Sequence, residues 1–427
     1  MLVGSAARRV AIIGGSRIPF ARGNGAYAEV GNQEMLTATL QGLVERFGLA
    51  GERIDEVAAG AVMKHSSQWD LTREAVLGSG LAPETPGLDV QRACGTSLEA
   101  AILLGNKIAL GQIDCAIAAG VDTVSDPPVA FPRSFQQLLL KSYRGRTATQ
   151  RLRPWLRLRP GHFRPVLPGV TEPRTGLSMG ESTELMVKTW GIGREEQDQL
   201  ALESHQKGAA AYAAGFYRDL VRDYLGLTQD NNLRSDTSLE KLAHLKPAFD
   251  PVGGTLTAGN STPMTDGASA VLLATDAWAR ARKLPVLAYL TYGKVAAVDF
   301  VVKKEGLLMA PAYAVPRMLA DAHLTLQDFD YYEIHEAFAG QVLCTLKAWN
   351  DADFCRDRLH LPSVLGTIDR ARLNVKGGSI ALGHPFAATG TRILATLAKV
   401  LDENRARRGL ISICTAGGQG VTAVVER

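Results

Sequence analysis

Four side chains in this sequence, two thiols and two imidazoles, have the chemistry of an acyl-transfer site. Cys94 lies in RACGTSLEAA, where a short strand runs into a helix of small residues, and Cys414 lies in ISICTAGGQG, where a buried strand meets glycines. His335, in YYEIHEAFAGQ, follows a strand, and His384, in GGSIALGHPFAATGTR, stands among glycines and small residues. Because a thiol beside an imidazole performs nucleophilic acyl chemistry, these residues are the candidates for catalysis.

Each candidate also has a purely structural interpretation. Cys94 and Cys414 fit buried structural thiols. His335 fits a helix cap beside Glu336, and His384 fits a neutral ring that satisfies a loop hydrogen bond. Their positions favour function, because free N–H groups at a helix start stabilise a thiolate at Cys94. The N–H groups of a glycine-rich turn after Cys414 can bind an oxyanion.

Strand and helix patterns alternate around these residues. A strand, a reactive residue, a helix of small residues and a second strand occur around Cys94 and again around His384. This repetition predicts two duplicated α/β halves, and the βαβ pattern predicts a largely parallel sheet. The four candidates lie at strand ends, which predicts one shared cleft. Residues 126–175 are rich in Pro and Arg and show little periodicity, so they indicate an excursion away from the sheet.

Bulk properties exclude several classes of protein. The 427 residues exceed the size of a single core, so two or three domains are expected. No run of about 18 apolar residues exists, and the start of the chain has too short an apolar core for a secretory signal. The cysteines are odd in number and widely spaced, which indicates free thiols in a reducing cytosol. HEAFA lacks the second histidine of a zinc motif, and AIIGGSR lacks the full dinucleotide-binding spacing.

Positive charge is concentrated in one stretch. Residues 131–174 contain ten Lys and Arg side chains against Glu172 alone, a local charge of about +9 within a chain of net charge +4. The rest of the chain therefore carries about −5. Three interpretations are open: a solvated cationic loop, a surface that meets or steers an acidic substrate, or a docking segment for a partner or a membrane surface. The stretch mixes Leu, Phe and Trp with Arg, as interfacial segments do.

Five motifs together resemble the thiolase superfamily, and their order and spacing hold across nearly the whole chain: QRACGTSLEA, AGNSTPMTDGASA, HEAFAGQ, NVKGGSIALGHPFAATGTR and CTAGGQG. The histidine of HEAF stands where many thiolases carry asparagine. That variant resembles 3-ketoacyl-CoA thiolases of the type found as the β-subunit of the fatty-acid oxidation trifunctional complex and in its bacterial counterparts.

The resemblance implies a fold and a division into domains. It implies two duplicated βαβαβαββ halves that form a layered α/β/α/β/α core with an inserted lid (loop) domain. The N-terminal half would comprise residues 1–125 and 247–284, and the C-terminal half residues 285–427. The lid would comprise residues 126–246, including the Arg-rich segment.

The resemblance also assigns roles. Cys94 corresponds to the nucleophile that becomes acylated, and His384 to the histidine that takes its proton. Cys414 corresponds to the second cysteine, which acts as acid and base. His335, with His384, corresponds to the stabiliser of the thioester oxyanion. The backbone N–H groups of Cys94 and Ala416 correspond to a second oxyanion hole, although the family usually has glycine in place of Ala416.

For the substrate, the resemblance indicates CoA contacts at Thr262, Arg234 and Met179. CoA is expected as a co-substrate, with no permanently bound cofactor and no metal. The implied activity is ping-pong thiolysis of 3-ketoacyl-CoA in β-oxidation. The nearest alternative is an acetoacetyl-CoA thiolase that works in the condensing direction. A non-catalytic CoA- or lipid-binding scaffold is a remote one, and a decarboxylating ketosynthase is disfavoured because such enzymes have histidine at the position of Cys414.

The expected partners are acyl-CoA and CoA, a second copy in a homodimer or a dimer of dimers, and a hydratase/dehydrogenase α-subunit. Peripheral membrane contact through residues 131–174 is also expected, whereas nucleic acid is not. The expected location is the cytoplasm, with membrane association through the Arg-rich segment.

Overall fold

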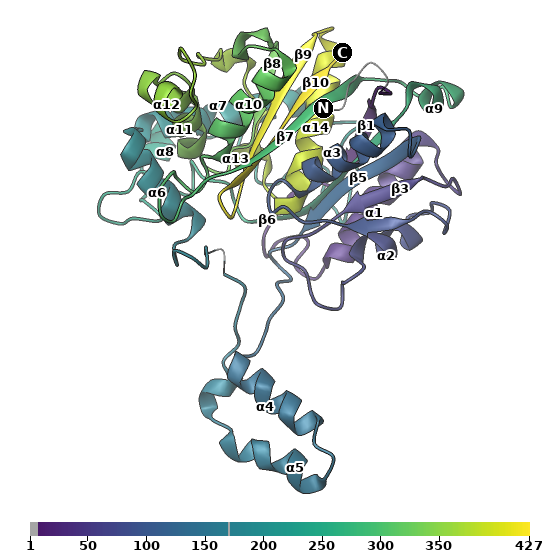
Figure 1. Cartoon of the computed structure of the whole chain (residues 1–427), viewed down its shortest axis with the longest axis vertical. Coiled ribbons are helices and arrows are strands. Elements are labelled where there is room, and N and C mark those ends of the chain that lie inside the picture. The colour runs from purple at the N-terminus through teal and green to yellow at the C-terminus, as the bar shows by residue number, and fades with distance from the viewer. Residues whose placement is uncertain (1–6, 170) are drawn as a thin grey trace.

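The strands of the protein form one ten-stranded mixed sheet (Figure 1). The computed structural model describes residues 7–169 and 171–427, so the first six residues of the segment tested for a secretory signal lie outside it. The strand order is β4-β3-β5-β6-β1-β7-β10-β9-β8, and β2 pairs with β6 beside this path. The strands are β1 (Ala11–Arg17), β2 (Ala21–Arg22), β3 (Glu56–Ala59), β4 (Gly87–Asp89), β5 (Cys115–Asp122), β6 (Thr265–Ala274), β7 (Ala288–Ala297), β8 (Tyr331–Ile334), β9 (Arg408–Thr415) and β10 (Gln419–Glu426).

Helices separate most of these strands along the chain. The α-helices are α1 (Asn32–Phe47), α2 (Leu71–Gly78), α3 (Thr96–Ala109), α4 (Arg133–Tyr143), α5 (Ala148–Leu152), α6 (Met179–Trp190), α7 (Arg194–Ala213), α8 (Leu239–Ala243), α9 (Asp276–Ala281), α10 (Ala310–Ala322), α11 (Ala339–Trp349), α12 (Ala352–Asp357), α13 (Ser379–Leu382) and α14 (Thr389–Glu403). The 3₁₀ turns are η1 (Arg153–Arg157), η2 (Pro160–Phe163), η3 (Leu326–Asp328), η4 (Arg370–Arg372) and η5 (Phe386–Ala388).

The two halves of the sheet repeat one topology, which confirms the predicted duplication. The first strand of each half, β1 or β7, pairs antiparallel with the last strand, β6 or β10. Those last strands pair antiparallel with β5 and β9, which run parallel to β3 and β8. The halves join where Ala11 pairs with Tyr289 and Ile12 with Ala288. The prediction of a largely parallel sheet is wrong in the centre, because β6 returns after the long excursion and β10 folds back as a hairpin.

Three hydrophobic cores define the predicted helix–sheet–helix–sheet–helix layers. The first core lies between α1, α2 and the first half-sheet, and the second surrounds α3 and α14 between the two half-sheets. The third lies between the second half-sheet and α6, α10 and α11. Because successive side chains of a strand point to opposite faces of the sheet, one strand contributes to two cores. Ile411 and Ile413 of β9 face the central core, whereas Leu410 and Cys414 face the outer core of the second half.

The central helices α3 and α14 approach each other with almost no space between their backbones. A Cβ atom at Gly390 would lie 2.3 Å from the backbone nitrogen of Leu98. The Ser97 hydroxyl oxygen accepts a hydrogen bond from the N–H of Thr391 at 2.9 Å. One step away, a Cβ atom at Gly120 of β5 would lie 2.1 Å from the carbonyl oxygen of Ala387. These contacts fix the start of α14 against the start of α3.

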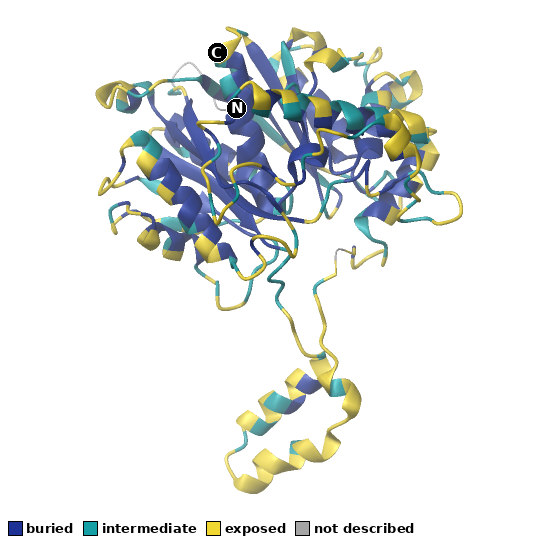
Figure 2. Ribbon diagram, turned by 180° about the vertical axis from the view of Figure 1, so that it is seen from behind, coloured by how far each residue is buried: buried dark blue, intermediate teal, exposed yellow. Residues whose placement is uncertain are grey.

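Residues 131–165 form a hairpin that protrudes from the body on two extended segments (Figures 1 and 2). It contains α4, α5, η1 and η2, although the sequence pattern indicated little regular structure there. Its small core is built on Phe135, which contacts the rings of Phe131, Trp155, His162 and Phe163. Most other side chains of the hairpin are exposed. Within residues 7–169 and 171–427, none of the helices has the length and apolar character needed to span a bilayer.

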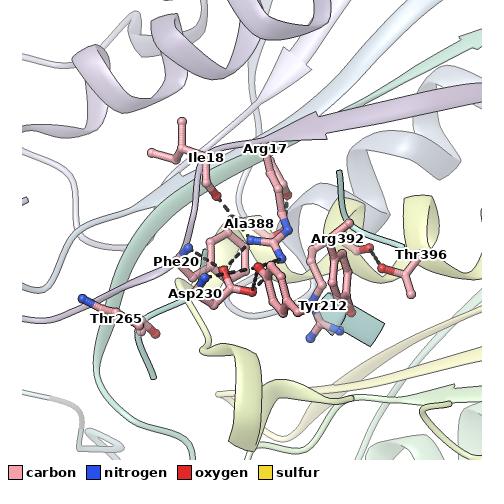
Figure 3. A network of polar contacts seen from close by, with 12 residues as sticks. Arg17, Ile18, Phe20, Tyr212, Asp230, Thr265, Ala388, Arg392 and Thr396 are labelled. Atoms are coloured by element: carbon pink, nitrogen blue, oxygen red, sulfur yellow. Dashed lines mark hydrogen bonds and ion pairs between the residues drawn. The ribbon is translucent and has the colours of Figure 1, made fainter. Parts of the chain in front are cut away.

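A buried ion pair ties β1 to the segment between α7 and α8 (Figure 3). Arg17 donates to both carboxylate oxygens of Asp230, at 2.5 and 2.7 Å. The hydroxyl of Tyr212 and the N–H of Phe20 donate to the same carboxylate, each at 2.7 Å. A charge buried this deeply is stable only with its partner, and the loss of one partner costs about 3–5 kcal/mol. The pair therefore anchors the inserted region to the sheet.

Candidate active site

Cys94 lies in a tight turn between β4 and α3. Ala93, just before it, has φ of 42°, in the left-handed region that strains a residue with a side chain. Gly95, just after it, is the N-cap of α3, and a Cβ atom there would lie 2.7 Å from the Val421 side chain. The N–H of Gly95 donates to the carbonyl of Arg92 at 2.9 Å. The turn thus directs the thiol toward the hairpin between β9 and β10.

The Cys94 thiol is protonated in the resting protein. Burial raises its pKa to about 12, although the backbone N–H groups of Ala416 and of Cys94 itself act in the opposite direction. Burial therefore outweighs the thiolate stabilisation that a helix start predicts. Activation has to come from a base that removes the proton when substrate is bound.

His384 lies in the short loop between α13 and η5, and it is buried. Its backbone N–H donates to the Thr265 hydroxyl at 2.7 Å, and its Nδ1 lies 2.5 Å from Oγ1 of Thr389. Burial, with the nearby positive charge of Arg392, lowers the pKa of His384 to about 3. Although the surrounding sequence is rich in glycine, these bonds fix the ring, which is neutral at physiological pH.

His335 follows β8 and is completely buried. Its Nδ1 lies 2.8 Å from the Ser379 hydroxyl, and burial lowers its pKa well below the usual range, with added effects of His384 and Arg392. Its Nε2 is buried and has no hydrogen-bond partner within the described ranges 7–169 and 171–427. The rings of His335 and His384 are tilted by 45° with centroids 4.1 Å apart.

The structure brings three of the predicted residues into one cluster. The sulfur of Cys94 and one ring nitrogen from each of His335 and His384 lie within 4.8 Å of one another. Among the described residues, this is the one group of three side chains with metal-ligand chemistry, and two imidazoles and a thiol are ligands that zinc accepts. A protonated thiol beside two neutral imidazoles equally provides a nucleophile, a base and a hydrogen-bond donor.

Cys414 joins the cluster from the end of β9. Burial raises the pKa of its thiol well above the usual range, with a further contribution from the Cys94 thiol nearby, whereas the backbone N–H of Ala337 acts in the opposite direction. The following turn brings the backbone N–H of Ala416 close enough to the Cys94 sulfur to lower the pKa of that thiol. Its role in an oxyanion hole stays a prediction. Glu172 accepts a hydrogen bond from the N–H of Gly417 at 2.6 Å, so the inserted region holds this turn.

The three predicted CoA contacts lie in different surroundings. The backbone N–H and the hydroxyl of Thr262 each lie 3.1 Å from the carbonyl oxygen of Ala337, so Thr262 adjoins the Cys414 site. Met179 begins α6 and packs against the outer core of the second half. Arg234 is exposed, and its N–H donates to Nδ1 of His205 at 3.2 Å.

Several residues that hold the site escaped the sequence analysis. Ser379 and Thr389 contact the two histidines, and Arg392 donates to Ser379 at 2.6 Å. Asp122 accepts hydrogen bonds from the N–H groups of Ala387, Val62 and Met63, and burial raises its pKa to about 7. The sequence does contain a signal for these residues, because they are polar residues within stretches that are otherwise small and apolar. Buried polar groups require hydrogen-bond partners, so such residues are candidates for holding a site.

Known proteins share this architecture. Residues 10–277 match the family model of the thiolase N-terminal domain, and residues 284–427 match that of the thiolase C-terminal domain. The chain is 39% identical over 424 residues to a 3-ketoacyl-CoA thiolase of Yersinia pestis (strain Pestoides F), an alignment that covers 98% of this chain and 97% of the relative. A 3-ketoacyl-CoA thiolase of Yersinia pseudotuberculosis serotype O:1b (strain IP 31758) gives the same values.

A solved structure agrees with these matches. The crystal structure of the Bacillus anthracis acetyl-CoA acetyltransferase is similar with a TM-score of 0.82 at 29% identity, over 99% of this chain and 100% of that one. The duplicated fold and its thiol–imidazole cluster define an acyltransferase. More particularly, the chain belongs to the thiolase family.

The protonation state of Cys94 leads to a prediction about its alkylation. We expect iodoacetamide to modify Cys94 slowly near pH 7 and about tenfold faster for each pH unit up to about pH 10, because the thiolate fraction rises tenfold per unit below the pKa. Peptide mass spectrometry at several pH values gives the rate at this cysteine, and glutathione provides the reference for an exposed thiol. A rate that levels off below about pH 8 would reveal a resting thiolate–imidazolium pair and contradict the account.

Proposed function

We propose that this protein is a CoA-dependent 3-ketoacyl-CoA thiolase that works by ping-pong transfer through Cys94 in fatty-acid β-oxidation. The observation that supports this proposal most strongly is that the Cys94 sulfur and one ring nitrogen from each of the two neutral histidines lie within 4.8 Å of one another. The Cys94 thiol is close enough to the second thiol, Cys414, to help raise its pKa. The Yersinia relatives carry this activity in their names.

In the first half-reaction, Nε2 of His384 accepts the Cys94 proton while the sulfur attacks the C3 carbonyl of the substrate. The new tetrahedral oxyanion accepts hydrogen bonds from the N–H groups of Cys94 and Ala416. The bond between C2 and C3 then breaks, and its electron pair forms the enolate of acetyl-CoA, whose oxygen accepts hydrogen bonds from His335 and the protonated His384. Each such donor contributes about 2.7–4 kcal/mol in known oxyanion holes.

Cys414 completes the proton balance. Its thiol donates a proton to C2 of the enolate, and acetyl-CoA leaves. The resulting Cys414 thiolate takes the thiol proton of an incoming CoA, whose sulfur attacks the acyl group on Cys94. The tetrahedral intermediate collapses to the shortened acyl-CoA, and Cys94 recovers its proton from His384. CoA is thus a co-substrate, and no step calls on a permanent cofactor or a metal.

For substrate binding, Thr262 is the best-supported CoA contact, because it adjoins Ala337 and through it Cys414. Arg234 is proposed to meet the CoA phosphate from its exposed position, and Met179 to line the approach. The proposed division is a first half of residues 1–125 and 247–284, a lid of 126–246 and a second half of 285–427. It is supported by β6, which returns after the lid to pair with β1 and β5.

The protruding hairpin supports a role in docking. Apolar side chains stand exposed between its arginines, including Tyr143, Leu152 and Leu156, which are 85%, 67% and 87% exposed. A solvated loop gains nothing from such residues, whereas an anionic membrane surface takes up both apolar and cationic groups. We therefore place peripheral membrane contact here, on a cytoplasmic enzyme. The proposed assembly is a homodimer or a dimer of dimers, with a hydratase/dehydrogenase α-subunit as the competing occupant of the hairpin.

The similarity to an acetyl-CoA acetyltransferase favours one alternative, an acetoacetyl-CoA thiolase that works in the condensing direction. Thiolysis rates separate the two. We expect kcat/KM to be at least about tenfold higher for 3-ketohexadecanoyl-CoA than for acetoacetyl-CoA, because added methylenes contribute hydrophobic binding energy. Loss of the enolate absorbance measures both rates. A preference for acetoacetyl-CoA would support the alternative, and absence of thiolysis at every chain length would contradict the proposed function.

Cys414→Ala should separate acyl transfer from carbon–carbon chemistry. We expect this variant to accept an acyl group from a saturated acyl-CoA onto Cys94, because His384 and the donor N–H groups assist the attack and the departing CoA thiolate, unlike an enolate carbon, can leave without a proton from Cys414. Thiolysis of 3-ketoacyl-CoA should fall by about 10²–10⁴, the usual contribution of general acid–base catalysis. Intact mass spectrometry measures acylation, and Cys344→Ala, at a buried thiol distant in sequence, is the matched control. Normal thiolysis by Cys414→Ala would remove its role.

The hairpin can be removed with little disturbance, because Ala130 and Val166 exchange two backbone hydrogen bonds at its base, at 2.9 and 2.7 Å. We expect a variant in which a two-glycine linker replaces 131–165 to lose flotation with vesicles of phosphatidylcholine and phosphatidylglycerol, and to keep activity on acetoacetyl-CoA. Leu152→Ser with Leu156→Ser should weaken flotation, unlike the control pair Leu77→Ser with Leu110→Ser at exposed positions of the body. Unchanged flotation after the deletion would contradict membrane docking.

A further inference from the structure

A buried polar chain leads from α14 to His335. Arg392, in the first turns of α14, donates through Nη2 to the hydroxyl oxygen of Ser379 at 2.6 Å. That oxygen lies 2.8 Å from Nδ1 of His335. Arg392, Ser379 and His335 are 2%, 1% and 0% exposed, so water does not compete with these contacts.

The hydrogen bonds from Arg392 through Ser379 to His335 have a definite donor and acceptor at each step. A guanidinium group can only donate hydrogen bonds, so Ser379 accepts from Arg392. Throughout residues 7–169 and 171–427, the only other partner of the Ser379 hydroxyl is Nδ1 of His335. The hydroxyl proton is satisfied only if it is donated to Nδ1, because an imidazole nitrogen that accepts carries no proton of its own. The ring proton of His335 must then be on Nε2.

This assignment explains the unpartnered atom of the site. Nε2 of His335 is the ring atom that lacks a hydrogen-bond partner in the described parts of the chain. In the Nε2–H tautomer it is a free donor beside His384 and Cys94, ready for an oxygen that becomes negative. The positive charge of Arg392 also disfavours a second proton on His335 and helps to lower its pKa. The donor is therefore a neutral ring.

The second histidine has the opposite arrangement. Nδ1 of His384 faces Oγ1 of Thr389, and the same oxygen lies 3.4 Å from the carbonyl oxygen of Pro385, which can only accept. When Thr389 donates to Pro385, it accepts from Nδ1–H of His384. Nε2 of His384 then carries a free lone pair, as a base requires.

We propose that Ser379 and Arg392 are positioning residues that hold His335 in the Nε2–H tautomer as an oxyanion donor, while Thr389 holds His384 in the Nδ1–H tautomer as the base. Neither Ser379 nor Arg392 touches the reacting atoms in this proposal; both act through His335. The inference deepens the proposed thiolase function and rests on it for its catalytic meaning, whereas the two tautomers themselves can be measured without any substrate.

The first experiment observes the tautomers directly. The full-length protein, labelled with ¹⁵N-histidine, is studied by long-range ¹H–¹⁵N correlation NMR, and His335→Asn and His384→Asn assign the two rings. We expect a protonated Nε2 at His335 and a protonated Nδ1 at His384 between about pH 6 and 8, and a mixture of tautomers at His335 in Ser379→Ala. A wild-type His335 ring with its proton on Nδ1 would overturn the proposal, whatever the activity of the enzyme.

The second experiment measures coupling by a double-mutant cycle. We expect Ser379→Ala to lower kcat for thiolysis about tenfold to 100-fold with KM nearly unchanged, approaching the effect of a lost oxyanion donor. In the His335→Asn background the same change should cost less than about threefold, because an amide has a fixed N–H donor and no tautomers. Ser379→Thr, which keeps the hydroxyl, should restore most of kcat.

Ser412→Ala is the matched control, since its hydroxyl is buried without a partner in the described structure. It should leave kcat and the His335 resonances unchanged. Equal losses from Ser379→Ala in both backgrounds would show a merely structural role and overturn the proposal. Absence of thiolysis in the wild type, with the two tautomers as stated, would instead reject the proposed function and leave the tautomer assignment intact.

Discussion

The contact between α3 and α14 is the constraint on which the site depends. The proposed nucleophile, Cys94, precedes α3 in the first half of the chain, and the proposed base, His384, precedes α14 in the second. They meet because Gly390 lets the α14 backbone approach Leu98, and because Gly120 lets the loop after His384 rest on β5. A side chain at Gly390 would push α14 away from the backbone of Leu98, and one at Gly120 would push β5 away from the backbone of Ala387. A close-packed interior accommodates such shifts only with strain. The duplicated half-sheets place α3 and α14 side by side. Gly390 and Gly120 then let the two halves pack closely at this point.

Burial sets the electrostatics of this contact. The thiols of Cys94 and Cys414 have raised pKa values and the two histidines have lowered ones, in each case chiefly because burial disfavours the charged form. The resting site is thus uncharged. In this state, proton transfer from the thiol to an imidazole becomes favourable only when a bound substrate develops an oxyanion. The hydrogen-bond donors that surround the oxyanion are already in place when its charge appears.

Much of this arrangement could be predicted from the sequence. The reactive residues lie at strand ends next to glycines and small residues, and the same pattern occurs twice, so the duplication and the grouping of Cys94 with two histidines could be predicted. The mixed sheet centre could not be predicted in this way, because the direction of β6 depends on where the chain re-enters the sheet after residues 123–264. Helix α4 could not be predicted from the sequence either, because its apolar face buries only Phe135 and Leu138. The roles proposed for Ser379, Thr389 and Arg392 could not be predicted from the sequence, because the direction of a hydrogen bond depends on which atoms meet in the folded protein.

The central claim is that an acyl group passes through Cys94. The most direct measurement mixes the wild-type enzyme with 3-ketohexadecanoyl-CoA in the absence of free CoA, quenches with acid within a turnover, and maps the peptides by mass spectrometry. The account predicts a tetradecanoyl group on the Cys94 peptide and one acetyl-CoA released per acylated site. An acyl group on Cys414 instead, or acetyl-CoA release without any acylated cysteine, would contradict it.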